Sequence, residues 1–242
     1  MLYPNFAVDL NEIKMAKFLS SSVGRKVAMA LSAFFLMSFL IIHLSVNLTS
    51  LFSEDVFNEF SHFMGTNPLV QYALQPVLIL GVIFHFVMGF VLEIRNRKAV
   101  GVKYAMNQGV ANSSWMSRNM LLSGAVILAF LVLHFIDFWI PEMNVKYIQG
   151  DMSGLLEPNT ADSGFRYYEE MVHKFESPLR VGFYVLGFVL LALHLLHGFN
   201  SAFQSMGLTA GRTKVWKNIG AFYSIVVPLG FVVIALFHHF NH

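Results

Sequence analysis

Five long, uninterrupted apolar stretches constrain this chain's fold more than any other feature of its sequence. A helix needs about 20 apolar residues to cross a hydrocarbon core roughly 30 Å thick, and each stretch is that long. None alternates as a barrel strand does, and within one continuous apolar segment only a helix satisfies its own backbone in lipid. The sequence therefore predicts an all-α integral membrane bundle with helices at about 25–48, 70–94, 118–140, 179–204 and 216–240.

The composition agrees with a membrane location. Charged residues make up 12% of the chain, about half the fraction of a typical soluble domain. The 242 residues suffice for about five or six spans, so we expect one transmembrane domain, residues 1–242. The chain has no cysteine, which excludes disulfides, thiolate iron–sulfur ligands and c-type haem attachment. A polar stretch, residues 9–17, precedes the first span, so we expect that span to be retained rather than cleaved.

The charges of the connecting segments predict the orientation. Basic residues gather before the first span, between the second and third, and between the fourth and fifth: Lys14, Lys17, Arg25, Lys26; Arg95, Arg97, Lys98, Lys103, Arg118; Arg212, Lys214 and Lys217. The other two connections, including a long loop at about 141–178, are acidic on balance. Because basic loops stay on the cytoplasmic side, we expect a cytoplasmic N-terminus and an external C-terminus.

Each of the first four predicted spans contains at least one histidine near its middle or its outer end, and the fourth contains two. Ionisable residues inside a span are costly and usually functional. His43 lies 18 residues beyond Arg25, and His134 lies 16 beyond Arg118. At 1.5 Å per residue, both histidines are roughly 24–27 Å from the inner boundary.

The other two histidines lie nearer the inside. His85 is 10 residues before Arg95, and His194 is 10 before Gln204, which places both roughly 15 Å from the inner boundary. Two histidines at each of two depths suit two stacked sites in which a haem iron lies between two imidazoles. We therefore predict two b-type haems, an outer one on His43 and His134 and an inner one on His85 and His194. Plain hydrogen bonds between helices are the structural alternative.

Glycines follow the two inner histidines at i+4, one turn along the same helix face: Gly89 after His85 and Gly198 after His194. A haem edge needs space where it passes a helix backbone, and glycine leaves that space. His197 is the alternative ligand to His194, since it lies three residues away and next to Gly198.

Several polar residues are candidates for supporting roles. Ser32 and Ser123 each precede the histidine of their own helix by 11 residues, close to three turns, so both should face the bundle interior at the inner level. There they either bond to the inner haem or allow close helix packing. Candidates for binding the haem propionates are Ser22, Arg25 and Arg118. Candidates for a quinone site near the outer haem are Gln71, Gln75 and Asp137.

These motifs resemble the five-helix, di-haem cytochrome b anchors of succinate:quinone oxidoreductases, the succinate dehydrogenases and fumarate reductases. The matching segments lie on the first four spans and are residues 43–47, 85–89, 118–134 and 194–198. The resemblance implies the same histidine pairing in a bacterial cytoplasmic membrane protein. It also implies electron transfer between an iron–sulfur subunit and a quinone, expected to be menaquinone.

The resemblance further implies a partner flavoprotein with covalent FAD, which holds the dicarboxylate active site, so we expect no such site in this chain. We expect the chain to contact membrane lipid, and we expect no nucleic acid partner. Two other interpretations remain open. One is the di-haem cytochrome b subunit of a hydrogenase or formate dehydrogenase. The other is a haem-free transporter in which the histidines relay protons.

Overall fold

The computed structural model describes residues 21–99, 119–157, 160, 163–209 and 211–241. Within these residues five helical segments are long and apolar enough to cross a membrane, and no β-strand occurs beyond one isolated bridge between Leu155 and Phe165. The five segments are Ser22–Leu51, Val70–Asn96, Met120–Ile148, Pro178–Ser205 and Thr213–Asn241. The predicted all-α membrane bundle is confirmed.

The first two spans are joined by a short helix. The first comprises α2 (Ser22–Leu48) and the 3-10 turn η1 (Thr49–Leu51), and the joining helix is α3 (Glu54–Thr66). The second comprises the π-helical segment η2 (Val70–Leu74) and α4 (Gln75–Ala99). Serine side chains cap two helix starts, because Ser21 accepts from the backbone N–H of Gly24 at 2.9 Å and Ser53 accepts from that of Val56 at 3.3 Å.

The third span is longer than the sequence predicted. It runs through α7 (Met120–His134), the π-helical η3 (Phe135–Trp139), α8 (Ile140–Met143) and the π-helical η4 (Asn144–Ile148). The expected loop from residue 141 therefore begins only after Ile148. Pro141 lies inside this continuous span, just after the π-helical η3. Lys146 is buried, pairs with Glu142 at 2.6 Å and donates to the Gly65 carbonyl. The charged residues beyond the predicted end of the span thus satisfy each other's charge inside the structure, and the helix continues.

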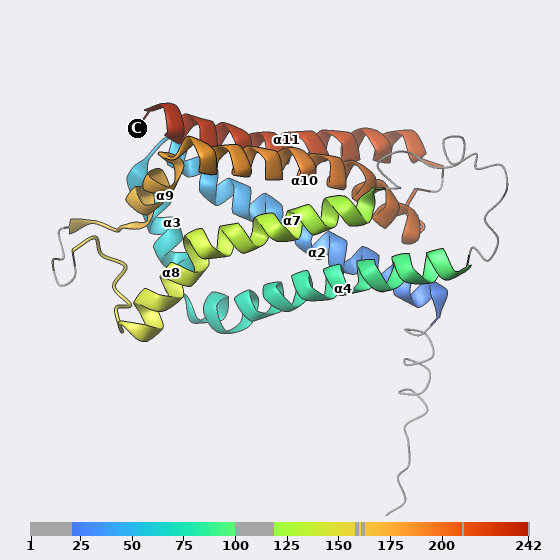
Figure 1. The fold of residues 1–242 in the computed structure, drawn as a ribbon, viewed down its shortest axis with the longest axis horizontal. Helices are drawn as coiled ribbons and strands as arrows, with labels where there is room; N and C mark the ends of the chain where they lie inside the picture. Colours follow the sequence, from blue (N-terminus) through green and yellow to red (C-terminus); the bar gives the residue numbers. More distant parts are fainter. Residues whose placement is uncertain (1–20, 100–118, 158–159, 161–162, 210, 242) are drawn as a thin grey trace, which may run out of the picture.

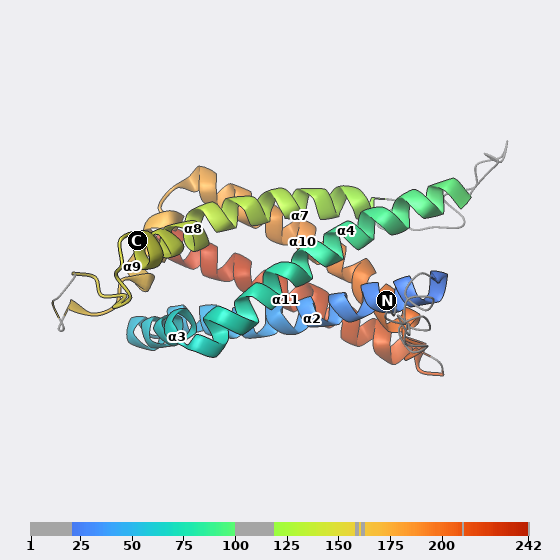
Figure 2. The same cartoon turned by 90° about the horizontal axis from the view of Figure 1, so that it is seen from below.

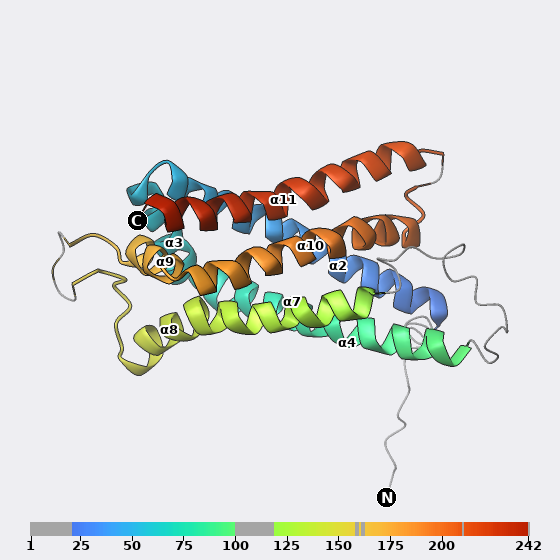
Figure 3. The same ribbon diagram turned by 45° about the horizontal axis from the view of Figure 1, so that its top comes forward.

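The last two spans are α10 (Pro178–Ser205) and α11 (Thr213–Asn241), preceded by the short helix α9 (Tyr167–Phe175). These two spans lie side by side (Figures 1 and 3). In the bundle, α4 packs against α2, α7 packs against α10, and α2 contacts both α10 and α11. The four helices that carry the span histidines thus surround a common interior, and α11 covers the side formed by α2 and α10.

The two ends of the bundle carry opposite charge. In Figures 1 and 2, α3, α9 and the C-terminal end of α11 lie at one end, and the start of α2 and the end of α4 lie at the other. We call the first the acidic end, since it holds Glu54, Asp55, Glu59, Glu142, Asp151, Glu157, Glu169, Glu170 and Glu176. We call the second the basic end, since it holds Arg25, Lys26, Arg95, Lys98, Arg212, Lys214 and Lys217.

Candidate functional site: two histidine pairs in the bundle

The structure brings the four span histidines together as two pairs. The rings of His43 on α2 and His134 at the end of α7 have centres 5.8 Å apart and planes 80° apart. The rings of His85 on α4 and His194 on α10 have centres 6.4 Å apart and planes 65° apart. An iron bound by two imidazole nitrogens at about 2 Å each separates the two ring centres by roughly 6 Å. The donor type and both spacings fit a six-coordinate haem iron.

The two pairs lie at different levels along the bundle. The hydroxyl of Ser32 on α2 is 3.0 Å from Nδ1 of His85, so Ser32 marks the level of the His85–His194 pair. His43 follows Ser32 on the same helix by 11 residues, or about 16 Å at 1.5 Å per residue. The His43–His134 pair is therefore the acidic-end pair, and the His85–His194 pair is the basic-end pair.

Hydroxyl groups from neighbouring helices contact both histidines of the basic-end pair. Ser32 is 3.0 Å from Nδ1 of His85, and Ser123 on α7 is 3.2 Å from Nδ1 of His194. Both serines face the interior at the level that the sequence predicted. His197 instead lies 3.2 Å from the hydroxyl of Ser201 on its own helix, so the geometry favours His194 as the partner of His85.

The glycines beside the basic-end pair leave room in the interior. A Cβ atom placed on Gly89 would meet, as its nearest described atom, the methyl group of Met29 at 3.8 Å. On Gly198 the nearest described atom would be the methyl group of Met120 at 3.5 Å. By contrast, a Cβ on Gly187 would lie 2.6 Å from the ring of Phe130. Gly89 and Gly198 therefore do not serve tight packing of the described residues, which fits their predicted role of making space for a haem edge.

The acidic-end pair has an aromatic environment. Phe39 stacks on His43 at 5.2 Å between ring centres, and Phe231 lies 5.5 Å from it. Phe138 lies 5.2 Å from the ring of His134. Nδ1 of His134 is buried and has no hydrogen-bond partner among the described residues. This pair is thus packed mainly by rings, whereas hydroxyls hold the basic-end pair.

Asp137 lies one turn beyond His134 and is engaged in a buried contact. Its carboxylate accepts from the Tyr184 hydroxyl at 2.8 Å and forms an ion pair with Arg180 at 2.8 Å. The side chain of Asp137 is 1% exposed, whereas that of Arg180 is 34% exposed. The structure therefore turns this predicted quinone residue toward α10, where it ties the third span to the fourth.

A pocket of about 410 Å³ lies between α4 and the third span at the acidic end. It contains both predicted glutamines and is lined by Gln71, Gln75, Pro76, Ile79, Leu80, Trp139, Met143 and Tyr147. Gln71 donates from its amide nitrogen to the Met64 carbonyl at 2.8 Å. Its Oε1 atom and the indole nitrogen of Trp139 are buried without a hydrogen-bond partner among the described residues. Two residues that line the pocket thus carry a buried acceptor and a buried donor without a hydrogen-bond partner among the described residues.

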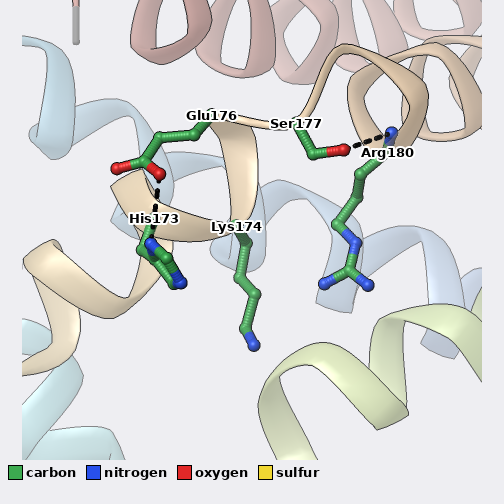
Figure 4. A pocket seen from close by; sticks show the side chains of 5 residues that line it. All are labelled: His173, Lys174, Glu176, Ser177 and Arg180. Atoms are coloured by element: carbon green, nitrogen blue, oxygen red, sulfur yellow. Dashed lines mark hydrogen bonds and ion pairs between the residues drawn. The ribbon is translucent and has the colours of Figure 1, made fainter.

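A second hollow, of about 350 Å³, opens at the start of α10 and is lined by His173, Lys174, Glu176, Ser177 and Arg180. Figure 4 shows the side chains of Lys174 and Arg180 extending in a similar direction, and His173 pairing with Glu176 at 3.2 Å. Because Arg180 also reaches Asp137, this hollow borders the ion pair beside the acidic-end histidines.

The remaining predicted residues lie at the basic end. Ser22 and Arg25 occupy the first turn of α2, at the basic end, and their role at the propionates stays a prediction. Arg118 lies outside the described residues. Sequence reasoning missed Trp139 and Tyr147 as pocket residues, because both lie close to or beyond the predicted end of the third span at 140. Their only sequence signal was their position as aromatic residues near a membrane interface.

Outside the spans, ion pairs and rings join the segments of the acidic end. Arg166 pairs with Glu142 and with Glu170, the latter at 2.6 Å, and these carboxylates raise the pKa of Arg166 against the opposing effect of burial. His62 on α3 stacks on Phe165 at 4.1 Å between ring centres. Burial and the charge of Lys146 lower the pKa of His62, against a raising effect of Glu142. These contacts connect α3, α8 and the segment before α9 at the acidic end.

A comparison with known proteins places these features in context. No family model matches the chain, and no solved structure matches it. The chain is 25% identical over 190 residues to the succinate dehydrogenase cytochrome b558 subunit of Bacillus subtilis (strain 168), covering 78% of this chain and 81% of that protein. This similarity agrees with the resemblance seen in the sequence, and with five apolar spans the chain is a multi-pass protein of the bacterial cytoplasmic membrane.

Proposed function

We propose that this chain is the cytochrome b membrane anchor of a succinate:quinone oxidoreductase. In this role it passes electrons between an iron–sulfur subunit and a membrane quinone through two b haems. The observation that carries the proposal is the presence of two histidine pairs at haem spacing, 5.8 and 6.4 Å between ring centres, at two levels of one membrane bundle. The name of the homologue, a succinate dehydrogenase cytochrome b558 subunit, supports both the cofactor and the complex.

The basic end is the cytoplasmic face in this proposal, because basic segments are retained on that side. An iron–sulfur subunit would dock there, together with a flavoprotein that carries covalent FAD and the dicarboxylate site. The basic-end pair then holds the inner haem, nearest those subunits, and the acidic-end pair holds the outer haem.

In each pair, two imidazoles from different helices would hold the haem iron. When bound, haem supplies one-electron redox chemistry that no side chain of this chain provides. The protein positions the ligands through helix packing: α4 packs on α2, α7 packs on α10, and α2 also contacts α10, so each histidine pair forms across the bundle interior. At the outer pair, the rings of Phe39, Phe138 and Phe231 exclude water from the imidazoles. Exclusion of water and the groups that bond to the ligands are the means by which a protein sets a haem potential.

The pocket between α4 and the third span is the proposed quinone site. Its volume, about 410 Å³, lies within the range of small-molecule sites. The indole N–H of Trp139 and Oε1 of Gln71 are buried without a partner among the described residues, and they are the proposed donor to a quinone carbonyl and acceptor from a quinol hydroxyl once a ring enters the pocket. Ile79 and Leu80 provide an apolar wall for a ring and its tail. The substrate class is a lipid-soluble quinone, with menaquinone as the expected member.

The position of Trp139 supports this assignment. It follows His134 by five residues on the same span, or about 8 Å at the rise of an α-helix, so the pocket lies close to the outer haem site. Reduction of a quinone takes two electrons and adds one proton to each carbonyl oxygen. The paired donor and acceptor suit both the oxidised and the reduced form of the ring.

The test is a reduced-minus-oxidised spectrum, a haem count and a flavin assay on the intact complex purified through this chain. Two b haems that succinate reduces, together with a covalently flavinylated partner, are the expected result. Two haems with a hydrogenase or formate dehydrogenase partner would move the chain to another quinone-linked complex. A preparation without a haem Soret band would overturn the proposal in favour of a proton-relay transporter.

A further inference from the structure

We propose that Ser32 and Ser123 are positioning residues that hold both basic-end histidines with the proton on Nδ1, which keeps Nε2 free for iron and lowers the potential of that haem. The inference rests on the proposed function, because it concerns the haem site of the basic-end pair. It names two hydroxyls, on helices other than those of the ligands, as the groups that tune this site.

The direction of the hydrogen bonds follows from the second contact of each hydroxyl. The Ser32 hydroxyl donates its single proton to the backbone carbonyl of Met29 at 2.8 Å. Its oxygen then has lone pairs left but no proton, so toward His85 it acts as an acceptor. The contact of 3.0 Å to Nδ1 of His85 is therefore an Nδ1–H donating to Ser32.

The same arrangement occurs at the second ligand. The Ser123 hydroxyl donates to the carbonyl of Met120 at 2.9 Å and lies 3.2 Å from Nδ1 of His194. Both imidazoles of the basic-end pair are thus neutral tautomers with the proton on Nδ1. In this tautomer the lone pair of Nε2 is available to a metal.

The same residue types, a methionine and a glycine, accompany the serine contact at each histidine of the basic-end pair. Met29, whose carbonyl orients Ser32, is also the nearest described neighbour of the Gly89 position, and Met120 has the same relation to Gly198. One half of the site is therefore built from α2 and α4, and the other half from α7 and α10, with the same residue types in the same roles. Such a repeat is not expected of an incidental packing contact.

The acidic-end pair lacks these acceptors. The amide nitrogen of Asn47 lies 3.4 Å from Nδ1 of His43, but that nitrogen donates to the His43 carbonyl at 2.7 Å and has no lone pair to offer. Nδ1 of His134 has no partner among the described residues. The outer site thus serves as an internal reference for the effect of the serines.

The effect on potential follows from ligand basicity. A hydrogen bond from the outer nitrogen of a metal-bound histidine fixes the ring and makes the ligand more electron-donating. A more donating ligand stabilises ferric iron relative to ferrous iron and lowers the potential. Removal of the acceptor should therefore raise the potential of the basic-end haem and leave the other haem unchanged.

The experiment compares Ser32→Ala and Ser123→Ala with wild type in the intact complex, by redox titration of each haem and by electron paramagnetic resonance of the two ferric signals. For each variant we expect both haems to be bound. At the wild-type midpoint of the basic-end haem, we expect its reduced-to-oxidised ratio to rise on the order of 2- to 10-fold, the equilibrium equivalent of one hydrogen bond. The double variant should show a larger rise.

Ser38→Ala is the matched control. Ser38 lies on the same helix and donates to the carbonyl of Phe34 at 2.9 Å, so the substitution removes the same type of bond away from the histidines. An equal shift in Ser38→Ala, an equal shift of both haems, or no shift in either serine variant would overturn the inference.

Isosteric substitutions cover the case in which alanine prevents haem binding. Ser32→Thr keeps the hydroxyl. Ser32→Val introduces a side chain with the shape of threonine but without a hydroxyl. We expect Thr to retain the haem near its wild-type potential, and Val to shift the potential or lose the haem. Equal behaviour of the two variants contradicts the inference. Wild-type protein without haem would instead refute the proposed function, so the two failures are distinguishable.

Discussion

The basic-end and acidic-end histidine pairs share one donor set but differ in their surroundings. Both histidines of the basic-end pair meet serine hydroxyls, at 3.0 and 3.2 Å, whereas phenylalanine rings pack around those of the acidic-end pair. Hydroxyl acceptors make imidazole a stronger donor, and an apolar environment disfavours the extra charge of ferric iron. Under the proposed function, this difference would give two chemically identical ligand sets two different potentials.

The largest effect should come from removing a ligand. His85→Leu or His194→Leu should abolish one haem, the same one, whereas His43→Leu or His134→Leu should abolish the other. The reason is that an axial ligand contributes a direct bond to the iron, which no neighbour replaces. A haem count and the α-band of the reduced spectrum measure the outcome. Loss of the same haem from His85→Leu and His134→Leu would break the pairing.

His197→Leu is the control for the ligand series. Its ring faces Ser201 on its own helix, at 3.2 Å, rather than His85. We expect this variant to keep both haems. Loss of the basic-end haem in His197→Leu with retention in His194→Leu would exchange the two assignments.

The next largest effect should appear at the quinone pocket. Trp139→Phe removes the free indole N–H and Gln71→Leu removes the free amide oxygen, so each should lower quinone reduction about 10-fold through the loss of one buried hydrogen bond. Reduction of the haems by succinate should persist, because the pocket lies beyond them in the electron path. Steady-state kinetics with a soluble quinone, set beside stopped-flow haem reduction, separate these steps.

The same chemical change elsewhere gives the reference for this pocket. Trp216→Phe at the basic end removes an indole that packs on Phe203 at 4.5 Å between ring centres, away from the pocket. It should leave the KM for quinone near its wild-type value. An equal loss in both tryptophan variants would argue for a general packing effect and against a quinone site at Trp139.

A smaller effect is expected from the ion pair beside the acidic-end histidines. Asp137→Asn leaves the charge of Arg180 without its buried partner, and Tyr184→Phe removes one hydrogen bond, about 1 kcal/mol. The first variant should lower the melting temperature of the detergent-solubilised complex more than the second. Because Asp137 faces α10 rather than the pocket, the KM for quinone should not change. A large rise in KM without loss of stability would return Asp137 to the quinone site.

The smallest effect is a pH dependence of the stability of the acidic end, where His62 packs on Phe165. The pKa of His62 is lower in the folded state than its unfolded value of about 6.5, through burial and Lys146. As the pH falls, His62 is therefore protonated in the unfolded chain at a higher pH than in the folded protein. The stability that His62 contributes is complete above pH 6.5 and is lost as the pH falls from there toward the lower pKa of the folded state. Thermal unfolding at pH 7.5 and 5.5 should show this loss, and His62→Phe should reduce it.

A loss of stability at pH 5.5 that is equally large in His62→Phe would remove the argument from burial of His62.

The sequence predicted the spans because long apolar stretches are a direct consequence of the lipid environment. It also predicted the two levels of histidines, because residue counts along a helix convert to depth. The structure pairs the rings in the predicted way, and their role as haem ligands stays a prediction. The sequence predicted that Ser32 lies at the level of His85 but not the hydrogen bond between them. The direction of that bond depends on the contact of the Ser32 hydroxyl with the Met29 carbonyl.

Other features depend on contacts between distant segments and were not predictable. The third span passes its predicted end because Lys146 reaches both Glu142 and the carbonyl of Gly65, which is far away in sequence. Likewise, the engagement of Asp137 by Arg180 and Tyr184 depends on how α10 packs against the third span. Hydropathy alone carries no information about such partners.

Among the described residues, the π-helical segments of the spans all lie at the acidic end, at Val70–Leu74, Phe135–Trp139 and Asn144–Ile148. A π turn accommodates one more residue than an α turn, and one residue corresponds to about 100° of rotation around the helix axis. The segment at Phe135–Trp139 thus changes the helical phase between His134 and Trp139. Deletion of one residue within it would leave His134 in the interior but rotate Trp139 away from α4. The acidic-end histidine pair and the pocket lined by Trp139 would then no longer be aligned on the same span, although neither His134 nor Trp139 is removed.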